Sequence, residues 1–213
     1  MGSVMDARSF FVAMGCVLTA GVATARAQSV ATPYHMPDFS ATQVLQTSKY
    51  SASMQVYRSG ASVRAQYTPS LARLFMPGQN AVLNLTRYPD GSRTCISFPL
   101  DRGMGLPNLL ELLHAATVQR TPLGTEVIEG HPTRIERAVV TTSDGRTSQF
   151  TVWLADDLKG VPVKIESADT GMRMSAVYRD IVLGTPDRAL FTPPIRCIPS
   201  NTMGQIAEHT VYK

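Results

Sequence analysis

Apolar and polar residues alternate most regularly between residues 123 and 183. Two runs in this stretch have an apolar residue at every second position: Phe150, Val152 and Leu154, and then Val161, Val163 and Ile165. A period of two predicts strands with one buried face. Asp144-Gly145 before the first run is typical of a tight hairpin turn, because both residue types tolerate a positive φ, and Gly160 and Pro162 mark the connection between the two runs. Short turns between such strands predict an antiparallel meander.

The first half of the chain has a similar but weaker pattern. Its predicted strands cover residues 50–58, 62–68, 71–76, 81–87 and 93–98, with turn residues between them. Residues 38–47 fit a short helix capped by Asp38 or Ser40 about as well as a strand, and we favour the strand. The first half is therefore predicted to be a meander as well.

Residues 108–118 are the one stretch with a clear helical period. Asn108 can cap the helix, and four apolar residues follow the i, i+3, i+4, i+7 spacing: Leu109, Leu112, Leu113 and Ala116. The helix interrupts two series of strands. Its leucine face is therefore expected to pack against the sheet, where each fully buried leucine contributes roughly 1.5–3 kcal/mol.

The first 27 residues resemble a cleaved export signal. Arg8 precedes an apolar run of small and large residues, and Ala25-Arg26-Ala27 fits a cleavage site between Ala27 and Gln28. A membrane anchor is the alternative, but the run is shorter than the roughly 20 residues of a spanning helix. Lipidation of Cys16 is a second alternative, although the apolar run continues past it. The sequence predicts a protein exported through a cleaved signal peptide.

Two cysteines, Cys95 and Cys197, remain after such cleavage. In an exported chain this number suggests one disulfide, which would hold the C-terminal segment against the middle of the sheet. Two separate buried thiols are the alternative. A count of free thiols in the denatured protein, with and without reductant, distinguishes them.

Composition and charge exclude some function classes. The 213-residue chain is 44% hydrophobic and 17% charged, which is typical of one folded domain, and its net charge of +4 comes mostly from dispersed arginines. Nucleic-acid binding needs clustered basic residues with stacking aromatics, so we expect no nucleic-acid partner.

Catalytic and metal-binding motifs were also sought. The histidines, His35, His114, His131 and His209, have no second ligand at metal-binding spacing, and the adjacent Asp156 and Asp157 are expected in a solvated turn. No nucleophile with an adjacent base is recognisable. We therefore expect no cofactor, no metal and no enzymatic activity. Trp153, the only tryptophan, could line a cavity or cover a sheet face.

Four segments resemble the LolA/LolB-like superfamily of bacterial periplasmic carrier and lipoprotein-sorting proteins. They are residues 57–64, 124–132, 152–166 and 186–194, the last containing Pro186-Asp187-Arg188-Ala189-Leu190-Phe191. The resemblance implies a mainly β (α+β) fold: an incomplete, curved antiparallel β-barrel whose mouth is covered by the leucine-rich helix. It implies a half-barrel domain over residues 38–198, after an irregular leader (28–37) and before a C-terminal tail (199–213).

The resemblance also implies a function. A curved sheet with an apolar concave face has to be covered, by a helix or by an acyl chain. We therefore predict a monomeric periplasmic protein that binds a lipid, an acyl chain or a lipoprotein. The candidate lining residues are Met54, Met76, Met104, Leu109, Leu113, Phe150 and Trp153. The alternative is an envelope sensor or assembly protein that recognises a protein partner through strand edges or loops.

Overall fold

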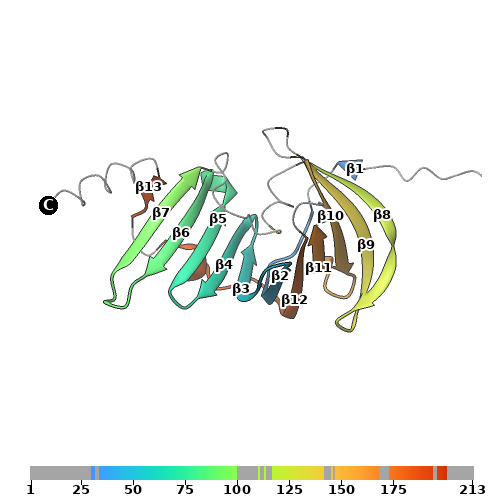
Figure 1. The fold of residues 1–213 in the computed structure, drawn as a ribbon, viewed down its shortest axis with the longest axis horizontal. Coiled ribbons are helices and arrows are strands. Elements are labelled where there is room, and N and C mark those ends of the chain that lie inside the picture. The colour runs from blue at the N-terminus through green and yellow to red at the C-terminus, as the bar shows by residue number, and fades with distance from the viewer. Residues whose placement is uncertain are drawn as a thin grey trace, which may run out of the picture.

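One open antiparallel sheet makes up most of the protein (Figure 1). The computed structural model describes residues 30–31, 34–99, 110, 113, 117–141, 145, 147–167, 173–193 and 196–200. Thirteen strands lie in the order β1-β8-β9-β10-β11-β12-β2-β3-β4-β5-β6-β7-β13, and only the pair β13·β7 is parallel. Among the described residues, no helix is long and apolar enough to cross a membrane.

The strands of the N-terminal half run from β1 to β7. Their bounds are β1 Val30–Ala31, β2 Phe39–Thr47, β3 Ser51–Ser59, β4 Ser62–Thr68, β5 Leu71–Met76, β6 Ala81–Arg87 and β7 Arg93–Pro99, with a 3₁₀ turn η1 at Pro77–Gln79. The predicted strands of this half are confirmed, and the ambiguous residues 38–47 form a strand.

The C-terminal half repeats the meander with longer strands. Their bounds are β8 Thr117–Ile128, β9 His131–Thr141, β10 Thr147–Ala155, β11 Val161–Ser167, β12 Met174–Leu183 and β13 Ile198–Pro199, with a 3₁₀ turn η3 at Arg188–Phe191. Two residues, Glu129 (φ 51°) and Gly130 (φ 84°), join β8 to β9. Two consecutive positive φ angles are typical of a type I′ turn, whose twist matches that of the strands it joins.

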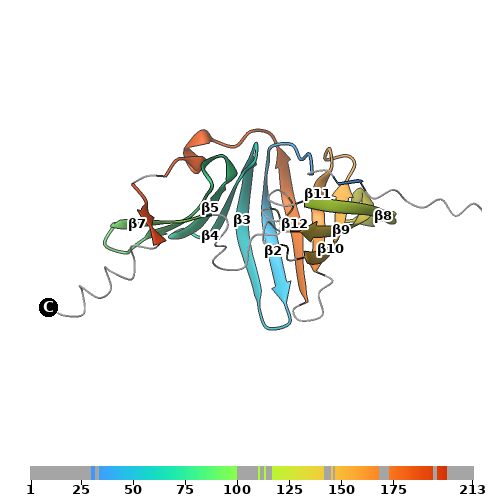
Figure 2. The ribbon, with the colours of Figure 1, turned by 90° about the horizontal axis from the view of Figure 1, so that it is seen from above.

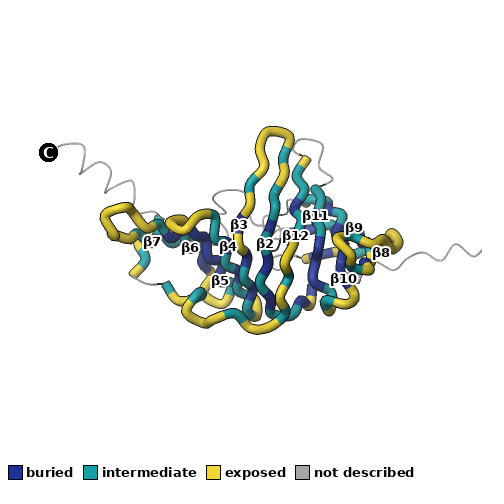
Figure 3. Tube along the Cα trace, turned by 90° about the horizontal axis from the view of Figure 1, so that it is seen from below, coloured by how far each residue is buried: buried dark blue, intermediate teal, exposed yellow. Residues whose placement is uncertain are grey.

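The sheet twists and curves so strongly that β4–β7 and β8–β11 run in different directions (Figure 2). β12 pairs with β2 and so joins the two halves into one sheet. Buried positions follow the central parts of the strands, whereas the tip of the β2–β3 hairpin is exposed (Figure 3).

Residues 34–38 lie on the inner side of this curve, and we call them the strap. The strap contacts both β9 and β3, which lie five strand positions apart. Five spacings are about 24 Å in a flat sheet, whereas the backbone from Tyr34 to Pro37 extends at most about 10 Å. A segment this short, aided by side chains reaching from both strands, bridges them on the inside of the bend. The face that packs against the strap carries one apolar cluster shared by both halves of the sheet, whereas the opposite face carries two separate clusters, and we call the strap's face the concave face.

The predicted irregular leader has no regular secondary structure at residues 34–37, and it contains the two-residue strand β1. Val30 and Ala31 form β1 on the edge of β8, and Tyr34 and Met36 are buried. The physical reason is that alternate apolar side chains, here Tyr34 and Met36, can pack on a sheet face even without regular strand pairing.

The predicted helix is described at two residues. Leu110 and Leu113 are helical and 0% and 1% exposed, as expected for a leucine face packed on the sheet. Its predicted end at residue 118 is wrong, because Thr117 and Val118 belong to β8 and pair with β9. β-branched residues favour the strand there. The remaining helix residues lie outside the described part of the chain.

A β-bulge changes the predicted faces of β11. The register shifts at Trp153 and Leu154, where β10 pairs with β11. Val161 and Ile165 pack in the concave face, but Val163 packs with Trp153 on the opposite side. An extra residue in one strand breaks the alternation, so the prediction that all three β11 residues share a face is wrong.

The C-terminal segment crosses the convex face of β5–β7. Cys197 forms a disulfide with Cys95 of β7, with the two Cα atoms 4.5 Å apart. Phe191 and Cys197 pack against a second apolar cluster, called the convex core: Ala72, Leu74, Met76, Ala81, Leu83, Leu85 and Cys95. The predicted pairing of the two cysteines is therefore present, and the tail holds Phe191 on the sheet. The domain boundaries and the signal cleavage site stay predictions.

Candidate ligand-binding face

The concave face carries the largest apolar cluster of the protein, called the concave core. From β2–β6 it takes Phe39, Ala41, Met54, Val56, Val63, Ala65, Phe75 and Val82, and from β8–β12 it takes Val118, Ala138, Val140, Phe150, Val152, Leu154, Val161, Ile165, Ala176 and Tyr178. Its other members, Tyr34, Met36, Leu110 and Leu113, come from the strap and the helix. The sheet thus supplies a continuous apolar surface, and two separate segments help to cover it.

Tyr34 closes the part of this face that lies near β8 and β9. Its hydroxyl donates to Glu136 Oε2 at 3.2 Å, and the Arg120 guanidinium lies 4.3 Å from the centre of its ring. Arg120 itself binds Glu136 through Nε and Nη2, at 2.7 and 2.8 Å. Such a bidentate pair fixes both partners, so the Tyr34 hydroxyl meets a preorganised acceptor.

The other end of the strap is held by more contacts. Arg58 donates to the carbonyl oxygen of Met36 and lies 3.8 Å from Asp38 Oδ1. Asp38 accepts hydrogen bonds from the Gly60 amide at 2.7 Å and from the Thr185 hydroxyl at 2.9 Å. The β3–β4 hairpin and the segment after β12 therefore fix the strap where it enters β2.

Burial changes the acid–base properties of these groups. Burial and the neighbouring Glu136 raise the pKa of the Tyr34 hydroxyl well above its ordinary value of 10.0, although Arg120 partly opposes this. The hydrogen bonds from Arg120 to Glu136 raise the pKa of that guanidinium. Burial lowers the pKa of Arg58, and Asp38 partly offsets the effect. At neutral pH, Tyr34 is a neutral donor.

The structure brings together some of the predicted lining residues. Met54, Leu113 and Phe150 all belong to the concave core. Met76 lies in the convex core instead, because β5 alternates and Phe75 points to the concave side. Met104 and Leu109 lie outside the described residues.

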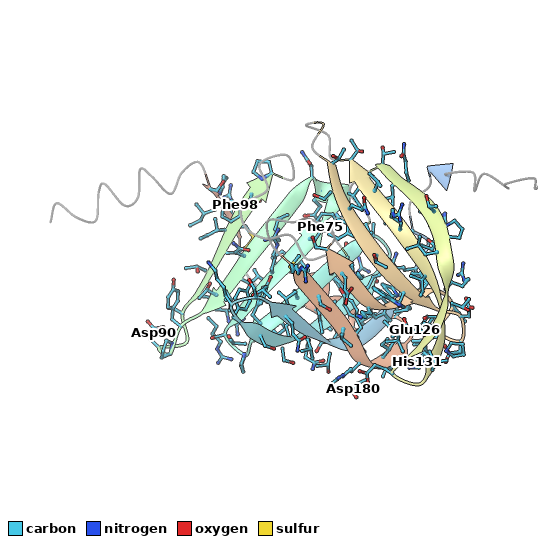
Figure 4. All side chains as sticks on the ribbon, turned by 45° about the vertical axis from the view of Figure 1, so that its right-hand side comes forward. Phe75, Asp90, Phe98, Glu126, His131 and Asp180 are labelled. Atoms are coloured by element: carbon cyan, nitrogen blue, oxygen red, sulfur yellow. A yellow bond between two sulfur atoms is a disulfide. The ribbon has the colours of Figure 1, made fainter. Side chains whose placement is uncertain are left out.

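Trp153 lies on the convex side and covers a sheet face there. Its Nε1 donates to Glu126 at 2.9 Å, and Lys164 Nζ lies 4.4 Å from its ring. It packs with Ala155 and Val163 under the end of the β8–β9 hairpin. Figure 4 shows Glu126, His131 and Asp180 together at this end of the molecule, away from Asp90.

Sequence reasoning missed Tyr34, Met36, Arg120 and Glu136. The first two carried a weak signal, since they are alternate apolar residues just before a predicted strand. Arg120 and Glu136 carried none, because they are 16 residues apart and meet only across β8 and β9.

The polar side chains at the turns form contacts at the surface. His131 Nδ1 lies 2.8 Å from Asp157 Oδ2, and Arg134 Nε lies 2.6 Å from Asp156 Oδ1, in the solvated turn predicted for the two aspartates. Within the part of the chain that the structure describes, no three His, Cys, Asp or Glu side chains are grouped so that they could hold a metal ion.

Several solved structures align with most of this chain at low sequence identity. A LolA superfamily protein from Nitrosomonas europaea is 14% identical and aligns over 76% of this chain and 92% of its own, with a TM-score of 0.44. MucB in the Pseudomonas aeruginosa MucA/MucB complex is 18% identical over 73% of this chain and 55% of its own, with a TM-score of 0.38. No family model and no curated protein matches the chain.

PNGF-II also aligns, over 80% of this chain, with 11% identity and a TM-score of 0.45. This chain spans only 32% of the length of PNGF-II. The identities and TM-scores are low throughout, so these similarities say nothing about ligand or activity.

Proposed function

We propose that this is an exported, periplasmic, non-enzymatic protein that binds a hydrophobic ligand on the concave face of its half-barrel. The ligand is a lipid, an acyl chain or the acyl part of a lipoprotein. The observation that carries the proposal is the concave core. It is one apolar surface that extends across the sheet from β8, near one end of the strand order, to β6, near the other. Side chains from two non-strand segments partly cover it.

The energetics of the covers support this proposal. Tyr34, Met36, Leu110 and Leu113 are at most 7% exposed, so each gains the full benefit of apolar burial. An acyl chain gains roughly 0.8 kcal/mol for each CH₂ group that it buries. A chain of a dozen or more carbons can therefore compete with these side chains for the same surface. The disulfide supports export, because disulfides persist in oxidising compartments.

Ligand binding can be tested directly. Purified protein is delipidated and titrated with a fluorescent acyl probe, while native mass spectrometry records lipids that copurify. We expect saturable binding of about one acyl chain per protein. A Phe150→Asp variant, which places a charge in the concave core, should lose binding, whereas Trp153→Phe on the convex side should keep it. Neither saturable binding nor a copurified lipid would contradict the proposal.

Recognition of a protein partner is the second candidate, and the edge of β8 favours it. Within the described part of the chain, β1 pairs with β8 at Gln119 and Arg120, while Leu123 and Val127 further along are 46% and 67% exposed. An exposed strand edge can take up an extended peptide through backbone hydrogen bonds. A stoichiometric envelope protein captured by the wild type and lost with Val127→Lys, without bound lipid, would favour this function.

A further inference from the structure

The strap covers the concave core near β9 with two side chains. Tyr34 is 3% exposed and Met36 is 7% exposed, and both belong to the concave core. A tyrosine ring and an unbranched methionine chain together resemble, in size and polarity, a short length of acyl chain next to a hydroxyl group. The strap thus fills the concave face with the kind of groups that the proposed ligand would bring.

We propose that the strap is the cover that the ligand displaces, and that the ligand is an acyl chain whose head group carries a neutral hydrogen-bond donor, which replaces the Tyr34 hydroxyl at Glu136. This inference rests on the proposed function and adds the position of the site, its opening and the chemical class of the head group. A glycerol hydroxyl and an amide N–H are such donors.

The contacts at the two ends of the strap are unequal, so the Tyr34 end opens. Among the residues that the structure describes, the strap is held there by one hydrogen bond, one cation–π contact and the two-residue strand β1. At the other end, Arg58, Gly60 and Thr185 hold the carbonyl of Met36 and both carboxylate oxygens of Asp38. Asp38 is therefore the fixed point about which the strap swings.

The charges around Glu136 select the head group. Arg120 binds both carboxylate oxygens of Glu136, and Arg134 Nη1 lies 3.7 Å from Oε1. Tyr34 donates to Oε2, so its departure leaves an acceptor that has lost a donor. Oε2 then keeps only its bond from Arg120 Nε, so one of its two donors has to be replaced. A neutral O–H or N–H restores the bond to Oε2, whereas an ionised carboxylate has no proton to donate to it.

The test compares three probes with the same chain: monopalmitoylglycerol, palmitate and methyl palmitate. Each competes with a fluorescent acyl probe for the full mature protein. We expect monopalmitoylglycerol to bind about tenfold more tightly than either of the others, as one restored hydrogen bond predicts. Equal affinities, or tighter binding of palmitate, would overturn the head-group assignment.

Strap opening is tested by the rate of probe uptake. The double variant Tyr34→Ala, Met36→Ala removes the two covering side chains and should take up the probe at least about tenfold faster, because the open state no longer has to expel them. Tyr50→Ala is the matched control: Tyr50 is 48% exposed and is not part of the concave core. Equal uptake rates for the folded double variant and the wild type would overturn strap opening.

Hydrogen exchange on the wild type provides a test that needs no variant. Loading with monopalmitoylglycerol should speed amide exchange in residues 34–36, while the Gly60 amide, bonded to Asp38, stays slow. Unchanged or slower exchange in the strap would overturn its displacement. If none of the three probes binds the wild type, the proposed function fails as a whole; if they bind without affecting the strap, only this inference fails.

Discussion

The two faces of the sheet are both covered, but by different means. On the convex face, the C-terminal segment is joined to β7 by a disulfide and places Phe191 on an apolar cluster from β5–β7. On the concave face, the strap and the helix are held by packing, hydrogen bonds and one buried ion-pair network. A covalent cover stays in place in an oxidising compartment, whereas a non-covalent one can be exchanged for another apolar group. The difference supports the concave face as the binding face.

The largest expected effect on the free energy of unfolding comes from removing the disulfide that holds the C-terminal segment on the convex face. Replacing Cys95 and Cys197 by serine opens a loop whose ends are 102 residues apart, and should lower the free energy of unfolding by roughly 4–5 kcal/mol. Urea unfolding of the variant and of the wild type measures the difference. If the convex cover is purely structural, acyl-probe binding by the folded variant should equal that of the wild type. A loss below about 1 kcal/mol would mean that the disulfide contributes little.

The next effect compares one leucine from each face. Leu113→Ala in the concave cover and Leu74→Ala in the convex core should each cost about 2–5 kcal/mol, since both side chains are at most 1% exposed. Only Leu113→Ala should change ligand uptake, because Leu74 lies on the other face. Unfolding curves and probe-uptake rates measure the two properties. Equal effects of both variants on uptake would contradict the assignment of the binding face.

A smaller effect is expected for Tyr34→Phe. This variant keeps the ring and its contact with Arg120 but removes the hydrogen bond to Glu136. A hydrogen bond to a charged group contributes about 1.5–3 kcal/mol, so the free energy of unfolding should fall by an amount in this range. Tyr50→Phe, at an exposed tyrosine, should change it by less than about 0.5 kcal/mol. A Tyr34→Phe variant with the same free energy of unfolding as the wild type would show that the strap is not held through Glu136.

The smallest effect is a pH dependence at the same tyrosine. The pKa of Tyr34 is raised in the folded protein, mainly by burial, so its neutral form stabilises the fold. This contribution is present below the unfolded pKa of about 10 and is lost as the pH rises above it. The wild type should therefore lose stability above about pH 10 more steeply than Tyr34→Phe. Parallel curves of unfolding free energy against pH would contradict this.

Local pattern was enough to predict the strands but not the site. Strands 71–76 and 81–87 were predicted at their observed bounds, because period-two alternation and the turn at Pro77-Gly78 are local signals. The position of Val163 on the convex face could not be predicted, because the bulge that places it there depends on how β10 and β11 pair. The end of the helix was misjudged for the same reason: pairing with β9 draws Thr117 and Val118 into β8.

The candidate site shows the same limit more clearly. Met54, Leu113 and Phe150 were found as apolar residues on periodic segments, and the structure places them in one cluster. Met76 and Trp153 are also large apolar residues on periodic segments, but their side chains face the other side of the sheet. Residue type therefore indicated burial, while the direction of each side chain depended on strand register.

The sequence by itself determined the class of fold and suggested that two distant cysteines are joined, because strand alternation, turn chemistry and cysteine number can be read directly from the chain. Only the tertiary structure decided which apolar surface is concave and what covers it. The network of Tyr34, Arg120 and Glu136 arises from the curvature and pairing of the sheet, which bring together residues up to 102 positions apart. Curvature is a property of many strands acting together, so no single segment of sequence specifies it.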